Sequence, residues 1–205
     1  TWVVPYASYT ASVAGTTAPG ASANVDFQAG NTTAWATQTI NSLRFNSSSA
    51  ATLAIASSGT LTIASGGILV GSGPSGTNAA AFTISGTSAK ITPGTGKELV
   101  VINNSTATLT LPIIAESASG VTDVTYRGSN GYVSGIRASQ ITPSTANTYS
   151  GNTYVSGVRI YVNTTGTAVF GSGTAQKVFI YGNNGGQFLK GTSASSTETK
   201  DWYVI

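Results

Sequence analysis

The chain has 205 residues, of which about 7% are charged, whereas a typical soluble domain carries roughly 25%. It contains no Cys and no His, which excludes disulfides, thiolate metal sites and the side chain most often used as a general base near neutral pH. Nine basic and six acidic residues give a net charge of +3, and the cations are scattered singly, so nucleic-acid binding is not expected. No apolar run approaches the ~18 residues that a membrane span needs.

Short segments in which apolar and polar residues alternate, separated by Gly, Asn, Ser and Pro, indicate β-strands along most of the chain. In chain order the predicted strands are residues 40–45, 52–56, 60–64, 68–70, 81–85, 98–103, 106–114, 121–126, 133–136, 153–155, 158–162, 168–170, 177–181 and 187–189. Alternation means that one face of each strand is buried and the other exposed. The sequence therefore predicts an all-β chain.

The spacing of these segments, every eight to twelve residues or so, permits a sandwich, a barrel or a β-solenoid. Three features favour the solenoid. The outward positions are small residues that stack well. The turns are Ser-Gly, Gly-Gly and Asn-Asn-Gly-Gly in place of hairpin loops. The pattern of strand and turn residues also repeats loosely over residues 52–73. We therefore predict a single-stranded parallel β-helix over residues 24–189. Residues 1–23 form an extended N-terminal segment that could donate a strand, and residues 190–205 a linker followed by a capping or pairing strand.

Residues 147–173, NTYSGNTYVSGVRIYVNTTGTAVFGSG, resemble the autotransporter-associated β-strand repeat of bacterial surface proteins. Asn147, Thr148, Tyr149, Ser150 and Gly151 match the start of that repeat, and Asn152 stands where a second Gly is usual. The resemblance extends over about residues 40–189, although GVTDV at 120–124 departs from the family's usual turn. It implies a right-handed parallel β-helix that is displayed outside a bacterial cell.

A β-helix has two ends, each of which presents unpaired backbone N–H and C=O groups. Apolar terminal segments could cap these ends or add a strand to a neighbouring subunit. The candidate self-association residues are Trp2, Val3, Val4 and Tyr6 at one end, and Trp202, Tyr203, Val204 and Ile205 at the other. The prediction is an extracellular structural protein, the subunit of a surface filament or matrix that assembles end to end as a homopolymer.

An adhesin that binds surface glycans is the alternative function. Tyrosines are concentrated in the second half of the chain, and a lateral row of their rings could stack on sugars. Tyr154 and Tyr161 are the candidate glycan-binding residues. The competing interpretation is that some of these rings lie inside the coil and others cover its rim.

A polysaccharide-degrading enzyme is a third alternative, because some β-helices carry clustered acids for that chemistry. Glu116 and Asp123 could face each other across a turn, but the carboxylates are sparse and there is no His. No calcium-type Gly-Gly-x-Gly-x-Asp run and no phosphate-binding loop is present. We therefore expect no catalytic residue, no metal and no cofactor.

Overall fold

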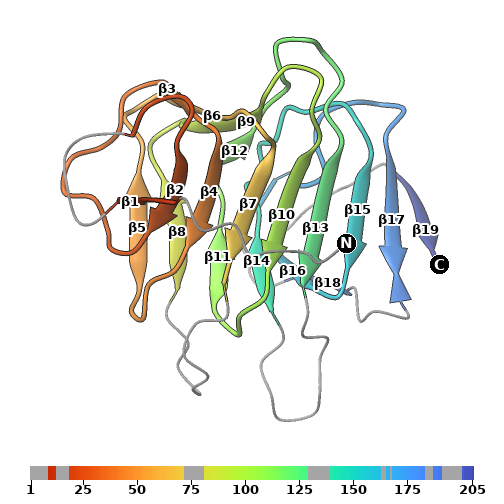
Figure 1. Cartoon of the computed structure of the whole chain (residues 1–205). Coiled ribbons are helices and arrows are strands. Elements are labelled where there is room, and N and C mark those ends of the chain that lie inside the picture. Colours follow the sequence, from red (N-terminus) through yellow and green to blue (C-terminus); the bar gives the residue numbers. More distant parts are fainter. Residues whose placement is uncertain are drawn as a thin grey trace, which may run out of the picture.

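The computed structural model describes residues 9–12, 19–71, 81–128, 139–162, 165–166, 168–182, 187–190 and 200–205. Within these ranges the chain is all-β, with nineteen strands and no α-helix. The strands are two to five residues long and form three sheets (Figure 1). The prediction of an all-β chain is confirmed.

The nine-stranded sheet, in spatial order, consists of β1 (Thr10–Ser12), β2 (Asn24–Phe27), β4 (Ser42–Phe45), β7 (Gly67–Val70), β10 (Leu99–Asn103), β13 (Val124–Gly128), β15 (Thr153–Ser156), β17 (Lys177–Tyr181) and β19 (Asp201–Val204). The six-stranded sheet consists of β18 (Gln187–Lys190), β16 (Arg159–Val162), β14 (Gln140–Thr142), β11 (Thr108–Thr110), β8 (Phe82–Ser85) and β5 (Ala51–Ala54). The four-stranded sheet consists of β12 (Ile113–Ile114), β9 (Lys90–Pro93), β6 (Thr60–Ile63) and β3 (Gln38–Ile40).

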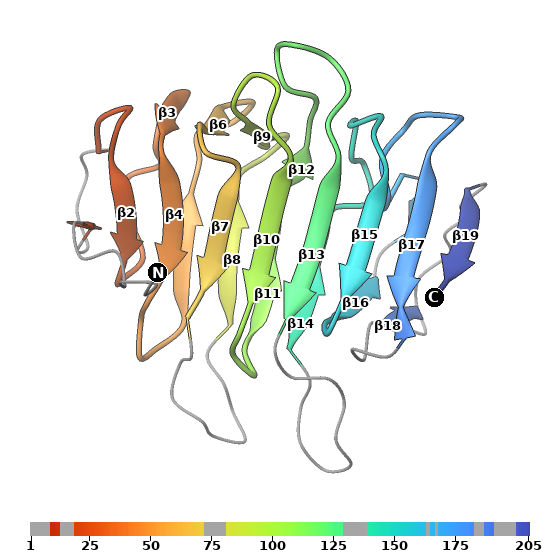
Figure 2. The same cartoon turned by 45° about the vertical axis from the view of Figure 1, so that its right-hand side comes forward.

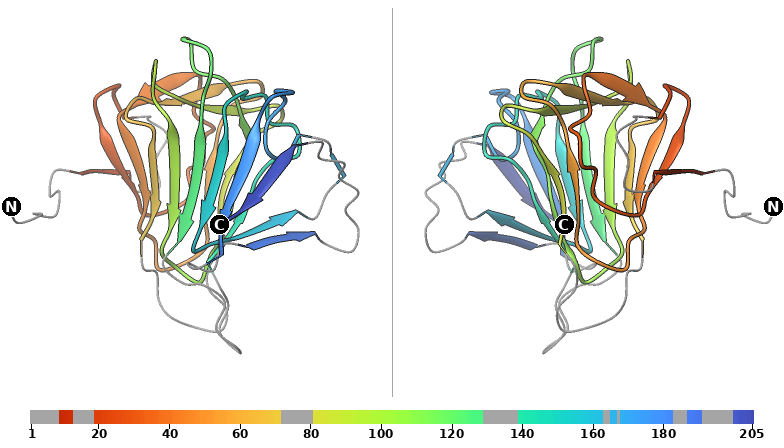
Figure 3. Two further views of the ribbon diagram at one scale, coloured as in Figure 1. Left: turned by 90° about the vertical axis from the view of Figure 1, so that its right-hand side faces the viewer. Right: turned by 90° about the vertical axis from the view of Figure 1, so that its left-hand side faces the viewer.

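All pairings between these strands are parallel. From β4 to β12 the chain passes through the nine-stranded, six-stranded and four-stranded sheets in turn, three times in the same order (Figure 2). Figure 3 looks along the row of strands from either end and shows the sheets around a shared interior. Each strand in the interior of a sheet therefore pairs with one strand before it and one strand after it in the chain, whereas the strands at the sheet edges pair on one side.

The core is built from rows of inward side chains that run across the strands. One row of the nine-stranded sheet consists, in register, of Val25, Leu43, Ile68, Val101, Tyr126, Val155, Ile180 and Val204. All of its members except Val204 are at most 9% exposed. Since alternate residues point outward, the neighbouring positions form parallel rows on the outer face of the same sheet.

Three strand predictions need correction. The predicted strand 106–114 is two strands, β11 and β12, because Pro112 between them has no N–H to donate to a ladder. The predicted strand 168–170 is wrong, since Ala168 makes an isolated bridge to Ala146 and the next two residues form a turn before Gly171, whose φ is +84°. The predicted strand 121–126 begins later, as β13. The predicted strand 133–136 lies outside the described residues.

Candidate functional site

The C-terminal candidates lie together on the last strand of the largest sheet. Trp202, Tyr203 and Val204 belong to β19, which pairs in parallel with β17, and Ile205 follows directly. Backbone hydrogen bonds hold the end of the chain, because the Ile205 N–H donates to Ile180 O at 2.9 Å and the Gly182 N–H donates to Ile205 O at 2.9 Å. β19 is therefore a hydrogen-bonded edge strand of the sheet. The N-terminal candidates Trp2, Val3, Val4 and Tyr6 lie outside the described residues.

Exposure rises abruptly at this edge. Ile180 is 9% exposed, whereas Val204, its partner in register on β19, is 78% exposed. In the adjacent inward row, Val178 is fully buried and Trp202 is 39% exposed. On the opposite side of the same sheet, Val25 on β2 is fully buried and is followed by Thr10 of the edge strand β1. The inward apolar rows thus reach the solvent at β19.

Aromatic rings form a column on the outer face of the same sheet. The Tyr154 and Phe179 rings stack with centroids 5.1 Å apart and planes 8° apart, and the Phe179 and Tyr203 rings stack at 5.1 Å and 22°. The ammonium of Lys177 lies 5.5 Å from the centroid of the Tyr203 ring. Centroid separations close to the ~4.8 Å strand spacing mean that the rings stack along the row and turn their edges toward solvent.

The two glycan-binding candidates are not brought together. Tyr154 lies on β15 of the nine-stranded sheet, and Tyr161 lies on β16 of the six-stranded sheet. Both are partly exposed, whereas Tyr126 and Tyr149 are fully buried inside the molecule. Burial, together with the neighbouring Tyr149, raises the pKa of the Tyr126 hydroxyl well above its ordinary value. A single lateral row that contains both candidates is therefore absent from the described residues.

Beside the aromatic column, the outer face is hollowed by a shallow cavity of about 350 Å³ that is open to solvent. Its lining residues are Thr125, Arg127, Tyr154, Ser156 and Tyr181. Tyr154 is one of the residues predicted from the sequence, whereas Arg127 was not predicted. Alternation could have shown that Arg127 points outward from its strand, but its position beside Tyr154 depends on the register between β13 and β15.

Glu116 and Asp123, the two carboxylates considered for catalysis, accept hydrogen bonds from residues of a later segment of the chain. Glu116 accepts a hydrogen bond from the Ser150 hydroxyl, and Asp123 Oδ1 accepts one from the Asn152 N–H at 2.7 Å. In the part of the chain that the structure describes, no three acidic residues gather into a group that could hold a metal ion. The arrangement joins neighbouring segments of the chain.

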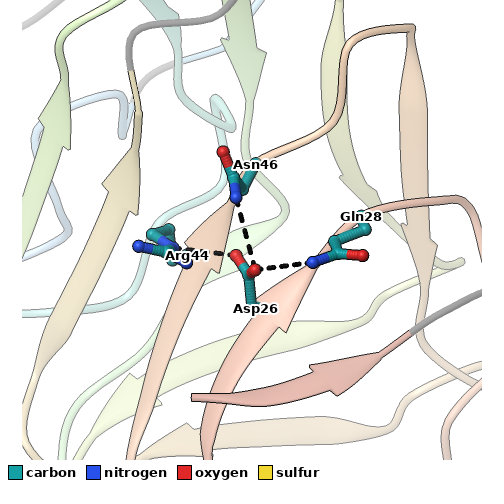
Figure 4. A network of polar contacts seen from close by, with 4 residues as sticks. All are labelled: Asp26, Gln28, Arg44 and Asn46. Carbon is teal, nitrogen blue, oxygen red and sulfur yellow. Dashed lines mark hydrogen bonds and ion pairs between the residues drawn. The ribbon is translucent and has the colours of Figure 1, made fainter. Parts of the chain in front are cut away.

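A polar network lies near the N-terminal end of the outer face (Figure 4). Asp26 is 4% exposed and accepts hydrogen bonds from Arg44 Nε at 2.8 Å, Gln28 Nε2 at 2.8 Å and Asn46 Nδ2 at 3.3 Å. The Arg44 guanidinium also lies 3.8 Å from the centroid of the Tyr9 ring. Burial alone would raise the pKa of Asp26, but these hydrogen bonds and the charge of Arg44 together lower it.

Comparison with known proteins finds no matching family model, no similar curated protein and no similar solved structure. A search of the described residues for a helix long and apolar enough to cross a membrane finds none.

Proposed function

We propose that the chain forms a right-handed parallel β-helix that serves as an extracellular structural subunit, with neighbouring copies joined end to end. Parallel pairing throughout and the repeated order of the three sheets support the coil. Right-handed crossovers between parallel strands are the strong general rule, and they agree with the resemblance over residues 147–173. The proposal assigns no catalytic activity and no cofactor to the chain.

The observation that carries the proposal is the exposed apolar end at β19. Burying a Val side chain completely stabilises a protein by about 1.5–3 kcal/mol, and Val204 is 78% exposed at the end of an otherwise buried row. Tyr203 at 40% exposure and Ile205 at 60% add outward apolar surface to the same strand. An added strand beside β19 would continue the inward row and cover Val204.

The proposed occupant is a second copy of this chain. Residues 1–6, TWVVPY, are apolar and would suit strand addition, in which backbone hydrogen bonds supply affinity and inward side chains supply fit. Joining the N-terminal segment of one copy to β19 of the next uses two different surfaces, so the assembly is heterologous and grows as an open filament. The low content of charged residues reduces repulsion between neighbours.

Negative-stain electron microscopy and light scattering of the purified chain test this proposal. Filaments are expected for the wild type and not for a variant that lacks residues 1–9 or for Val204→Lys, because a buried ammonium without a partner is costly. Val121→Lys is the matched control, since Val121 is 72% exposed in the segment that precedes β13 and its substitution should leave the filaments intact. A wild-type chain that stays monomeric at high concentration, or filaments that persist in both disrupted variants, would overturn the proposal.

A further inference from the structure

The cavity on the outer face of the nine-stranded sheet arises from the order of large and small side chains. Thr125 and Tyr154 are partners in register on β13 and β15, and Arg127 and Ser156 are partners two residues further along. The small Thr125 and Ser156 thus lie diagonally across from each other and leave space between the larger Tyr154 and Arg127. Tyr181, the partner of Ser156 on β17, closes the far side.

One face of the Tyr154 ring is turned into this space. Its other face is stacked on Phe179, which follows it in the row. The position before it in the row is Thr125, whose short side chain cannot cover an aromatic ring. An open aromatic face beside hydroxyl groups is the environment in which the C–H face of a sugar ring packs while its hydroxyls are hydrogen-bonded.

Arg127 supplies a positive charge at the same place. Its side chain is exposed, and within the described ranges the structure records no hydrogen bond or ion pair for its guanidinium. Glu98 accepts a hydrogen bond from the lining residue Thr125, but it does not neutralise Arg127. Glu98 precedes the first residue of β10, whereas Arg127 pairs in register with Ile102 near the other end of that strand. A guanidinium that is free to form two parallel hydrogen bonds suits a carboxylate.

We propose that this cavity binds an acidic sugar, with a uronate ring on the face of Tyr154 and its carboxylate on Arg127. The volume of about 350 Å³ lies at the lower end of the range for small-ligand sites, about 300–1,000 Å³, and suits a short stretch of an acidic polysaccharide. Among the described residues that line the cavity Arg127 is the single cation, which disfavours nucleic acid because binding a phosphate backbone needs several. This function is independent of end-to-end assembly.

Isothermal titration calorimetry with sodium oligogalacturonate tests the site, with Val204→Lys as a non-assembling background. Arg127→Gln and Tyr154→Ala are each expected to weaken binding at least tenfold. The fully methyl-esterified oligomer should bind at least tenfold more weakly than the acid. Lys90→Gln is the matched control, because it removes one exposed positive charge on the four-stranded sheet and should change affinity less than twofold.

Circular dichroism of each variant establishes that any lost binding is not lost folding. Absence of oligogalacturonate binding by the parent, equal losses in Arg127→Gln and Lys90→Gln, or equal affinity for the esterified oligomer would each overturn the proposal. Tighter binding of an acidic peptide or of single-stranded DNA than of the uronate would also overturn it. Filament formation by the wild-type chain is unaffected by any of these outcomes, so failure of this site is distinguishable from failure of the structural role.

Discussion

Buried polar side chains join segments that are far apart in the chain. Asn147 is fully buried, and its Oδ1 accepts a hydrogen bond from the Ile114 N–H at 2.8 Å. Its Nδ2 donates to Val169 O at 2.7 Å and to Ser144 O at 2.9 Å. A single amide therefore satisfies backbone groups of an earlier and a later segment, in addition to the backbone hydrogen bonds from Thr148 N–H to Ile114 O and from Asn147 N–H to Ala168 O.

Asn147→Ala is expected to lower the free energy of unfolding by about 3 kcal/mol, because it leaves a buried N–H and two carbonyls without this partner. Urea unfolding followed by circular dichroism measures the change. Asn104→Ala is the control, since Asn104 is partly exposed and its loss should cost less than about 0.5 kcal/mol. Equal effects of the two substitutions would contradict the assigned role of Asn147.

The network around Asp26 should appear as a dependence of stability on pH. Because the pKa of Asp26 is lower in the folded chain than in the unfolded chain, its contribution to stability is present at neutral pH. That contribution is lost as the pH falls through the folded-state pKa, and it is worth about 1–2 kcal/mol for a partly exposed pair with Arg44. The stability difference between wild type and Asp26→Asn should therefore shrink between about pH 5 and pH 2.

Denaturant titrations of both proteins across this pH range measure that difference. The double variant Asp26→Asn/Arg44→Gln should be more stable than the sum of the two single losses predicts, since the two residues share one interaction. A wild-type advantage that stays constant from pH 7 to pH 2 would show that the Asp26 charge does not contribute to stability.

Close approach between neighbouring turns restricts side-chain size at certain glycines. β6 and β9 pair in register, so that Ala64 and Gly94, which follow them, lie side by side. A Cβ added at Gly94 would lie 2.3 Å from Ala64 O, which is backbone and cannot rotate away. At Gly20 an added Cβ would meet no atom of the described residues within 4 Å.

Gly94→Ala should therefore destabilise the chain by about 1–3 kcal/mol through overpacking. Gly20→Ala should change stability by less than about 1 kcal/mol, since it adds no clash. Thermal or urea unfolding of the two variants compares them directly. Equal stabilities would mean that the turns after β6 and β9 do not approach as closely as described.

Alternating apolar residues predicted most of the strands, including strands of only four residues. The predicted strands 52–56, 60–64 and 98–103 correspond to β5, β6 and β10. β9 and β14 carry one aliphatic residue each, Ile91 and Ile141, so they show no alternation and were not predicted. β2 was also missed, although Val25 and Phe27 alternate around Asp26.

The same limit applies to the sites. Apolar residues at the C-terminus indicated a pairing strand, but which of them point inward is fixed by the register with β17. The cavity beside Arg127 depends likewise on the register between strands that are separate in sequence.

The two ends of the molecule differ in the exposure of their tryptophan side chains. Near the N-terminal end, Trp35 is 1% exposed and packs edge-on against Phe27, with ring centroids 6.0 Å apart. Near the C-terminal end, Trp202 packs edge-on against Phe170 at 5.2 Å but stays 39% exposed. This asymmetry gives the molecule a direction, which is what head-to-tail assembly requires.

Tryptophan fluorescence should report the proposed joint at β19. In a Trp2→Phe background the signal comes from Trp35, which is already buried, and from Trp202, which an added strand would cover. Assembly should therefore shift the emission to shorter wavelength and reduce quenching by acrylamide, whereas Val204→Lys should keep the spectrum of the monomer at every concentration. Because burial of Trp202 follows from continuing the inward rows across the joint, filaments that leave its emission and quenching unchanged would place the contact between subunits at another surface.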